Sequence, residues 1–286
     1  MTTDISQRIR NAYSGFSKSY KRIANAVIND YEKIGDMTAE RLGKYVGVSE
    51  STVVRFAGAL GFDRYSEFQL AVSDLTRKKL TPNQRITATK RKIYRRDIIE
   101  NVMRSDINRI KDTMESLDKK VFSDAVDTII KSKSIYVIGA RGSEPLAKML
   151  QYNLALIFDN VKFILPNSSA EVLEQIYPIG SGDTLIAFSY PRYSSKVVNA
   201  VKYAKTNGAN VILFTDTEAL PPAEHASLLL LSQVDIASFM DSLVGPLCII
   251  NALIIEITNR CEGNIRRRFD KLEGIFGEYG VYSNDK

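Results

Sequence analysis

The chain has 286 residues, 44% of them hydrophobic, which is enough for two domains with sizeable cores. No charge-free run of about 18 apolar residues is present, and the N-terminus lacks a signal-peptide pattern, so we expect a cytoplasmic protein without a membrane span. One histidine, His225, and two isolated cysteines, Cys248 and Cys261, disfavour a metal site or a catalytic triad, and the cysteines are expected to be buried, reduced thiols. We expect neither a metal nor a cofactor.

Basic residues gather in the N-terminal third of the chain. Residues 1–96 contain 19 Lys or Arg against 9 Asp or Glu, and residues 97–286 contain 20 against 24. The two parts carry formal charges of +10 and −4, a distribution typical of a nucleic-acid-binding module attached to a mildly acidic body. Basic surfaces also occur for solubility, so the charge distribution alone does not decide the function.

Two short helices joined by a tight turn are predicted between Met37 and Tyr65. The first follows Thr38, a favourable N-cap, and ends at Gly47, because glycine accepts the left-handed conformation that ends helices. Ser49 caps the second helix, whose apolar side chains recur at helical spacing and form one buried stripe: Val53, Phe56, Ala57 and Leu60. Amphipathic helices are also predicted on both sides of this pair, over Asp4 to Ser14, Ser17 to Tyr31 and Tyr65 to Leu75.

The other face of the second helix is free for an outside partner. Its side chains are small or hydrogen-bonding and suit base edges and phosphates: Glu50, Ser51, Thr52, Arg55 and Gly58. The pattern predicts a helix-turn-helix with Ser49 to Leu60 as the recognition helix in a major groove. The alternative is an ordinary helix pair in an all-α core. The predicted DNA contacts are Thr38, Lys44, Ser49, Ser51, Thr52 and Arg55.

A basic linker is predicted between two domains. The stretch from Thr76 to Arg96 has nine basic residues, no acidic ones and little periodic apolar content. A solvated tether and a role in phosphate contact are both consistent with this composition. We therefore predict an all-α DNA-binding domain over residues 1–77, a linker over 78–96 and a second domain over 97–286.

The second domain alternates short apolar runs with helical segments, which indicates a doubly wound α/β sheet. Five buried parallel strands are predicted over Ile135 to Ile138, Lys162 to Leu165, Thr184 to Phe188, Asn210 to Phe214 and Ser227 to Leu231. Helices are predicted over Asp97 to Leu117, Val121 to Lys131, Glu144 to Phe158, Ser169 to Tyr177, Ser194 to Asn207, a short piece near Leu220, Asp241 to Arg260 and Ile265 to Tyr279.

Two loops of this domain each follow a strand, open a helix and contain an arginine: Gly139 to Ser143 and Ser189 to Ser194. Ligands of doubly wound sheets bind at the carboxyl ends of the strands, where helix N-termini attract anions. The loops therefore suggest a site for a phosphate or another small anion. Ordinary helix capping is the alternative for each loop. No acidic residue about 20 positions after the first loop supports a dinucleotide site.

The motifs resemble a known family over most of the chain. Gly-Val-Ser, Thr-Val-Val-Arg-Phe and Leu-Gly-Phe, extended through Tyr65, Phe68 and Leu70, are similar to the N-terminal domain of RpiR-type bacterial transcription regulators. Residues of about 120–262 resemble the sugar isomerase (SIS) domain that follows it in this family, a five-stranded, flavodoxin-like fold that binds phosphorylated sugars. The resemblance implies a regulator that is a homodimer or homotetramer and binds a palindromic operator.

The resemblance also assigns the two loops, with one departure. The loop with Ser143 is similar to the family's first phosphate loop, and Ser189 and Ser194 match the first and last hydroxyls of its Ser-x-Ser-Gly-x-Thr loop. Pro191 and Arg192 replace the middle serine and glycine, which removes a hydroxyl and a backbone donor. Arg192 suits a phosphate or a sugar carboxylate. The predicted effector contacts are Arg141, Gly142, Ser143, Glu171, Ser189, Arg192 and Ser194.

We predict a transcription regulator, not an enzyme, whose second domain senses a phosphorylated sugar or sugar acid. Sugar isomerisation is the rival function. It needs a base near a carbon-bound proton. The candidate bases are Glu171, Glu174 and His225, whose ordinary roles are helix N-terminal charges and a loop histidine. A purely structural DNA-binding protein, the third alternative, leaves the anion loops without a purpose. Thr215-Asp216 resembles the family's Thr-Asp turn and is interpreted as structural.

Overall fold

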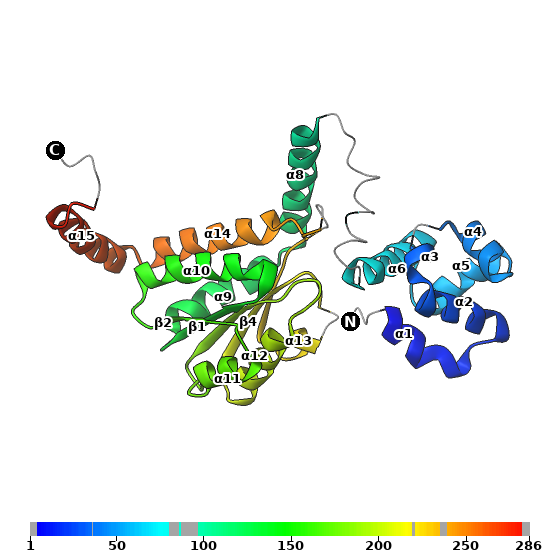
Figure 1. Ribbon diagram of the computed structural model, residues 1–286, viewed down its shortest axis with the longest axis horizontal. Coiled ribbons are helices and arrows are strands. Elements are labelled where there is room, and N and C mark those ends of the chain that lie inside the picture. Colours follow the sequence, from blue (N-terminus) through cyan, green and yellow to red (C-terminus); the bar gives the residue numbers. More distant parts are fainter. Residues whose placement is uncertain are drawn as a thin grey trace. The chain divides into compact units, whose positions relative to one another are not determined.

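The computed structural model describes residues 5–35, 37–79, 86, 97–218, 221–234 and 239–281. The chain divides into two compact units, Met1–Ile93 and Tyr94–Lys286 (Figure 1). Most of the predicted linker lies outside the described residues.

The N-terminal unit is all-helical, as predicted, and its core is built around Phe56. The Phe56 ring meets Phe16, Tyr20 and Phe68 edge-on, with centroids 5.3, 5.4 and 5.9 Å away. The predicted helix from Ser17 to Tyr31 is divided at Asp30, whose φ of −120° departs from helical values. The helices are α1 (Ile5–Ala12), η1 (Tyr13–Gly15), α2 (Lys18–Asn29), α3 (Tyr31–Ile34), α4 (Ala39–Val46), α5 (Glu50–Ala59) and α6 (Tyr65–Lys79).

The C-terminal unit contains a sheet of five parallel strands in the order β2-β1-β3-β4-β5, which confirms the predicted doubly wound fold. Alternate residues of each strand face opposite sides of this sheet. Val137, Ile186 and Ile212 join one buried cluster, while Ile138, Leu185 and Leu213 join the other. The strands are β1 (Ile135–Gly139), β2 (Val161–Ile164), β3 (Thr184–Phe188), β4 (Asn210–Thr215) and β5 (Leu228–Leu231).

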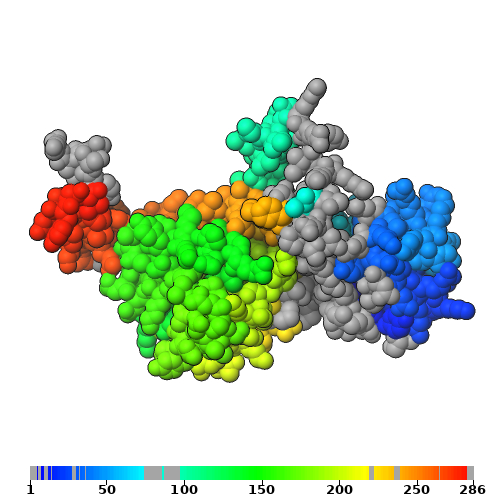
Figure 2. All heavy atoms as spheres, in the orientation of Figure 1, coloured from blue at the N-terminus to red at the C-terminus, as the bar shows by residue number. Residues whose placement is uncertain are grey.

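Helices cover both faces of the sheet (Figure 1). One cluster takes side chains from α9, α10 and α14, and the other from α11 and α12. The helices of this unit are α8 (Ile98–Ser116), α9 (Lys119–Lys131), η2 (Arg141–Ser143), α10 (Glu144–Ile157), α11 (Ser169–Ile176), α12 (Ser195–Thr206), α13 (Pro221–Glu224), α14 (Val244–Arg260) and α15 (Glu262–Glu278). The first half of α8 stands clear of the rest of this unit (Figure 2).

Within the described residues, no single helix is long and apolar enough to cross a membrane. Val244–Arg260 and Ile265–Glu278 meet those criteria only together, across a bend of 101°. Ile250, Leu253 and Ile257 of α14 are fully buried in the core of the C-terminal unit. Cys248 and Cys261 are free cysteines, but both are half-buried and not buried as predicted. Cys261 packs against that core from the end of α14.

Candidate functional site

The predicted caps of the helix-turn-helix are present. Thr38 Oγ1 accepts a hydrogen bond from the Arg41 N–H at 3.3 Å, and Ser49 Oγ accepts one from the Thr52 N–H at 3.3 Å. Gly47 ends α4 with a φ of 68°, which glycine adopts without strain. These three residues therefore fix where α4 ends and α5 begins.

Gly43 is a residue of this turn that the sequence analysis missed. A Cβ atom at Gly43 would lie 2.8 Å from the carbonyl oxygen of Val48, and the Val48 N–H donates to the Gly43 carbonyl at 2.8 Å. The chain after α4 thus folds back directly over this glycine. The signal in the sequence was a glycine inside an amphipathic helix, where it weakens the helix unless packing requires it.

The predicted recognition face of α5 is exposed and internally hydrogen-bonded. Ser49 Oγ lies 3.0 Å from Ser51 Oγ and 2.8 Å from Thr52 Oγ1. Arg55 Nε donates to the Ser51 carbonyl at 3.2 Å, while its side chain stays exposed. The buried stripe that faces the core contains Val53, Phe56, Ala57 and Leu60, as predicted. This arrangement orients the polar side chains at the start of α5 toward solvent.

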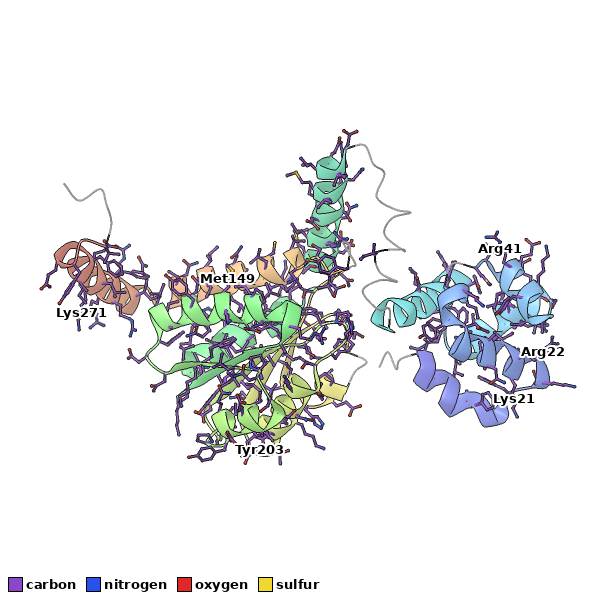
Figure 3. The ribbon with its side chains drawn as sticks, viewed as in Figure 1. Lys21, Arg22, Arg41, Met149, Tyr203 and Lys271 are labelled. Atoms are coloured by element: carbon purple, nitrogen blue, oxygen red, sulfur yellow. The ribbon has the colours of Figure 1, made fainter. Side chains whose placement is uncertain are left out.

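Further basic side chains surround this face. Lys44 donates to Glu40 across a fully exposed ion pair of 2.6 Å, and this hydrogen bond lowers the pKa of the Glu40 carboxyl. Such a pair is weak enough to exchange for a phosphate. Arg22 of α2, which the sequence analysis did not single out, donates to the Gly47 carbonyl at 3.2 Å. Arg22 and Arg41 both lie on the surface of the unit (Figure 3).

The two predicted anion loops lie side by side in the C-terminal unit. β1 and β3 are adjacent and parallel, with Gly139 paired to Phe188 at their carboxyl ends. β2 lies on the far side of β1 and β4 on the far side of β3, and the helices that follow β1 and β3, α10 and α12, cover opposite faces of the sheet. The loops therefore meet where the strand order reverses, the usual ligand position of this fold.

Ser143 faces inward, unlike the expectation of a hydroxyl at a helix end. It is 8% exposed, and its Oγ accepts from the Ala140 N–H at 3.3 Å. The hydroxyl lies within hydrogen-bonding distance of the carbonyl of Ala140, at 3.0 Å, and of Phe188, at 3.2 Å. Ser143 thus joins the loop after β1 to the end of β3. Contact with a ligand would require this hydroxyl to reorient.

Other residues of the two loops have polar groups without protein partners among the described residues, so these groups are available to a ligand. Arg141 and Arg192 adopt left-handed φ values of 58° and 70°, and both guanidinium groups are exposed without a hydrogen-bond or ion-pair partner among the described residues. Ser189 Oγ is buried and has no hydrogen-bond partner there. Ser194 begins α12, yet its hydroxyl makes no capping bond. A Cβ at Gly142 would meet only open space. Left-handed non-glycine residues and an unpaired buried hydroxyl are typical of functional sites.

Two tyrosines that the sequence analysis did not single out hold the second loop. The Tyr190 hydroxyl lies 2.6 Å from Ser232 Oγ at the end of β5, and the Tyr193 hydroxyl donates to Asp216 at 2.8 Å at the end of β4. Asp216 therefore supports the loop, which agrees with a structural role for the Thr-Asp turn. In the sequence, Arg192 lies between the two anchored tyrosines.

Glu171 and Glu174 lie on α11, after β2. The Glu171 carboxylate accepts from the Asn167 side-chain amide at 3.0 Å and from the Ser168 hydroxyl at 3.3 Å. Ser168 Oγ also accepts from the Glu171 N–H at 3.1 Å, so both residues are engaged at the N-terminus of α11. Lys196 of α12, missed in the sequence, reaches this segment and donates to the Asn167 carbonyl at 2.6 Å.

His225 precedes β5, near the amino ends of the strands and away from the anion loops. Two residues later, the Ser227 N–H donates to the carbonyl of Val211, near the start of β4. The loops occupy the carboxyl ends of the strands. The structure therefore separates His225 from Glu171 and Glu174. The chain must cross from the carboxyl ends of the strands to their amino ends before β5 begins.

Two family models match the chain: the helix-turn-helix domain of the rpiR family over residues 3–79, and the SIS domain over residues 128–256. The fold and these matches define a DNA-binding helix-turn-helix domain joined to a SIS domain. The chain thus has the domain organisation of an RpiR-type transcriptional regulator.

A relative and two solved structures are similar to this chain. An uncharacterized HTH-type transcriptional regulator of Haemophilus influenzae is 26% identical over 233 residues, 80% of this chain and 80% of that protein. The Vibrio vulnificus NanR protein, complexed with ManNAc-6P, matches 98% of this chain and 100% of its own at a TM-score of 0.61 and 18% identity. The SIS domain of the Sphaerobacter thermophilus RpiR transcription factor matches 62% of this chain and 99% of its own, with a TM-score of 0.60 and 21% identity. At these identities the solved structures show a shared fold.

Proposed function

We propose that this protein regulates transcription in the cytoplasm by binding DNA through α4 and α5, and that an anionic sugar metabolite bound to its SIS domain alters that binding. The observation that carries the proposal is the pair of loops at the ends of β1 and β3. Each presents an exposed arginine with a left-handed φ at the switch point of the sheet. A phosphorylated sugar is the ligand class that these loops suit best.

The proposed effector contacts are Arg141, Gly142, Ser143, Glu171, Ser189, Arg192 and Ser194. The guanidinium groups would neutralise the anion, because arginine binds phosphate or carboxylate with two parallel hydrogen bonds. Ser194 and the N–H groups that open α12 and η2 would add donors. NanR, which carries ManNAc-6P in its solved structure, supports a sugar phosphate as the first ligand to test.

The proposed DNA contacts are Thr38, Lys44, Ser49, Ser51, Thr52 and Arg55. Arg55 would read base edges, while the hydroxyls and Lys44 would contact phosphates. We further propose that the chain forms a homodimer or homotetramer through the C-terminal unit, so that two helix-turn-helix domains bind a palindromic operator.

The regulator is preferred over the isomerase. Proton transfer between neighbouring carbons needs a base positioned by the pocket. The Glu171 carboxylate is occupied by hydrogen bonds from Asn167 and Ser168, and His225 precedes β5 near the amino ends of the strands. Glu174 is exposed on α11. None of the three is therefore arranged with a second acid–base group beside the anion loops.

A thermal-shift screen of the full chain tests the proposal. The probes are N-acetylmannosamine 6-phosphate, glucose 6-phosphate, gluconate and inorganic phosphate. Binding to the native state raises the melting temperature, because a ligand at a hundredfold excess over its Kd adds about 2.7 kcal/mol to the free energy of unfolding. A hit that changes the affinity for DNA from upstream of the protein's own gene supports the switch. Conversion of the hit to an isomer would favour the enzyme, and the absence of any shift with phosphorylated sugars or sugar acids would refute the proposed site.

A further inference from the structure

Buried hydrogen bonds connect the loop after β3 to helix α8. The first is made by Tyr190, which is 6% exposed and whose hydroxyl lies 2.6 Å from Ser232 Oγ. Burial raises the pKa of Tyr190 far above its usual range, so the phenol keeps its proton at every physiological pH. The pair therefore links the loop that contains Arg192 to the end of β5.

The next bonds lead from β5 to α8. The Ser232 N–H donates to the Thr215 carbonyl at 3.0 Å, which extends the β4–β5 ladder by one residue. The following residue, Gln233, leaves the sheet, and its N–H donates to Thr113 Oγ1 of α8 at 3.0 Å. Thr113 is 3% exposed. Two adjacent residues thus connect to the loop on one side and to α8 on the other.

The junction is tightly packed. A Cβ atom at Gly245, in the first turn of α14, would lie 2.6 Å from Thr113 Oγ1 and 2.8 Å from the Gln233 carbonyl oxygen. Only a glycine fits between these two groups. Because close-packed interiors do not absorb displacements gradually, a shift of the β5 exit must be passed to α8 or must break the Thr113 bond.

Two hydrogen bonds join helix α8 to the segments on either side of residue 240: Asp106 accepts from Ser242 Oγ at 2.8 Å, and Thr113 accepts from the Gln233 N–H. Within α8, Asp106 also accepts from Arg109 at 2.7 Å. The first half of α8 is otherwise exposed, and Ile99 and Met103 keep 72% and 61% of their surface accessible. A helix segment with few buried apolar contacts can change position at low cost, because little apolar surface has to be exposed. In the sequence, α8 directly follows the predicted linker.

We propose that Tyr190, Ser232 and Thr113 are positioning residues that couple the loop over residues 189–194 to the position of α8, and through α8 to the DNA-binding domain. The inference rests on the proposed function for its ligand: an anion held by Arg192 displaces the loop that Tyr190 anchors. Switching then follows because the anion binds the two positions of the loop with unequal affinity.

Hydrogen–deuterium exchange of the ligand-free, full-length chain tests this coupling. Tyr190→Phe removes the hydroxyl but keeps the ring, and should speed exchange about fivefold at α8 amides around Thr113, the effect of one lost hydrogen bond. Coupling is reciprocal. Thr113→Val should therefore speed exchange at the amides of Tyr190, Arg192 and Tyr193.

Two variants control for general loosening. Thr184→Val removes another buried threonine hydroxyl, which lies 2.5 Å from Ser132 Oγ at the amino end of β3, and should leave both segments unchanged. Thr113→Ser keeps the acceptor oxygen and should exchange like the wild type in the loop.

The coupling is refuted if each substitution affects only its own segment, or if Thr184→Val reproduces the effect of Tyr190→Phe. No ligand is present, so this result is independent of the sugar screen. A screen without hits would refute the effector site and leave the exchange data to decide the coupling.

Discussion

The absence of a side chain at Gly43 allows the chain between α4 and α5 to pack directly against α4. Gly43→Ala should lower the free energy of unfolding of the N-terminal unit by about 1–3 kcal/mol, because its Cβ would overlap the Val48 backbone, which has little room to move. Urea unfolding, read by proteolysis of this unit, measures the effect. Gly58→Ala is the matched control: its Cβ meets nothing within 4 Å, so it should be neutral or stabilising by about 0.5–1 kcal/mol. Equal stability of the two variants would contradict the close approach.

Tyr65 makes the N-terminal unit sensitive to alkaline pH. Its hydroxyl donates to the Met37 carbonyl at 2.8 Å, and burial raises the pKa of Tyr65 to about 12. The folded chain therefore holds the phenol proton more tightly than the unfolded chain, whose tyrosine pKa is about 10. This contribution to stability is complete below pH 10 and is lost as pH rises toward 12.

The matching variant is Tyr65→Phe, which lacks the titrating group. At pH 8 it should be less stable than the wild type by about 1 kcal/mol, through the lost hydrogen bond. In urea unfolding at pH 8, 10 and 11, the difference should shrink as pH rises. A difference that stays constant over this range would show that Tyr65 titrates normally in the folded chain.

At the scale of elements, substitutions in α5, the proposed recognition helix, and in α4 should separate base recognition from phosphate binding. Arg55→Ala should reduce the preference for the operator over random DNA by about 1–3 kcal/mol, since a bidentate base contact is lost. Lys44→Ala should weaken binding to both DNAs and lower the salt slope by about 1. Fluorescence anisotropy at several salt concentrations measures both effects. Undiminished operator preference in Arg55→Ala would exclude Arg55 from base contact.

The two serines of the anion loops should behave differently, because one is built into the fold. Ser143→Ala leaves the buried Ala140 N–H without its acceptor, which should cost about 1–3 kcal/mol of stability in the C-terminal unit. Ser194→Ala removes a hydroxyl that makes no capping bond, so stability should hold while effector affinity falls. Thermal unfolding and ligand titration of both variants separate these roles. Normal effector affinity in Ser194→Ala would place the ligand elsewhere.

Local rules explain which of these features the sequence revealed. Caps at Thr38 and Ser49 and the left-handed Gly47 depend on neighbours within four residues, and the structure confirms all three. The inward orientation of Ser143 depends on Phe188, 45 residues away. The separation of His225 from the anion loops depends on which end of the strands its loop reaches. Such long-range contacts leave no periodic trace in a single sequence.

At the scale of the whole molecule, the sequence indicated two units of different character. The strand pattern predicted five parallel strands, and the charge asymmetry pointed to the N-terminal unit as the one that meets DNA. The connection from Tyr190 to Thr113 could not be predicted, because it depends on β5 ending beside both the loop and α8. Propensities describe elements, whereas this connection is a property of their assembly.

The left-handed conformation of the two arginines implies a conflict between thermal stability and affinity for the ligand. A side chain at φ of 70° costs about 1–2 kcal/mol that glycine would not incur, partly offset by the greater freedom of glycine in the unfolded chain. Arg192→Gly should therefore melt at the same temperature or slightly higher, yet bind a sugar phosphate at least about tenfold more weakly, as expected for a lost charged hydrogen bond. Calorimetry and ligand titration of the same sample measure the two effects. Selection of this protein for heat resistance alone would favour such a change, and would thereby produce a sturdier regulator that no longer responds to its metabolite.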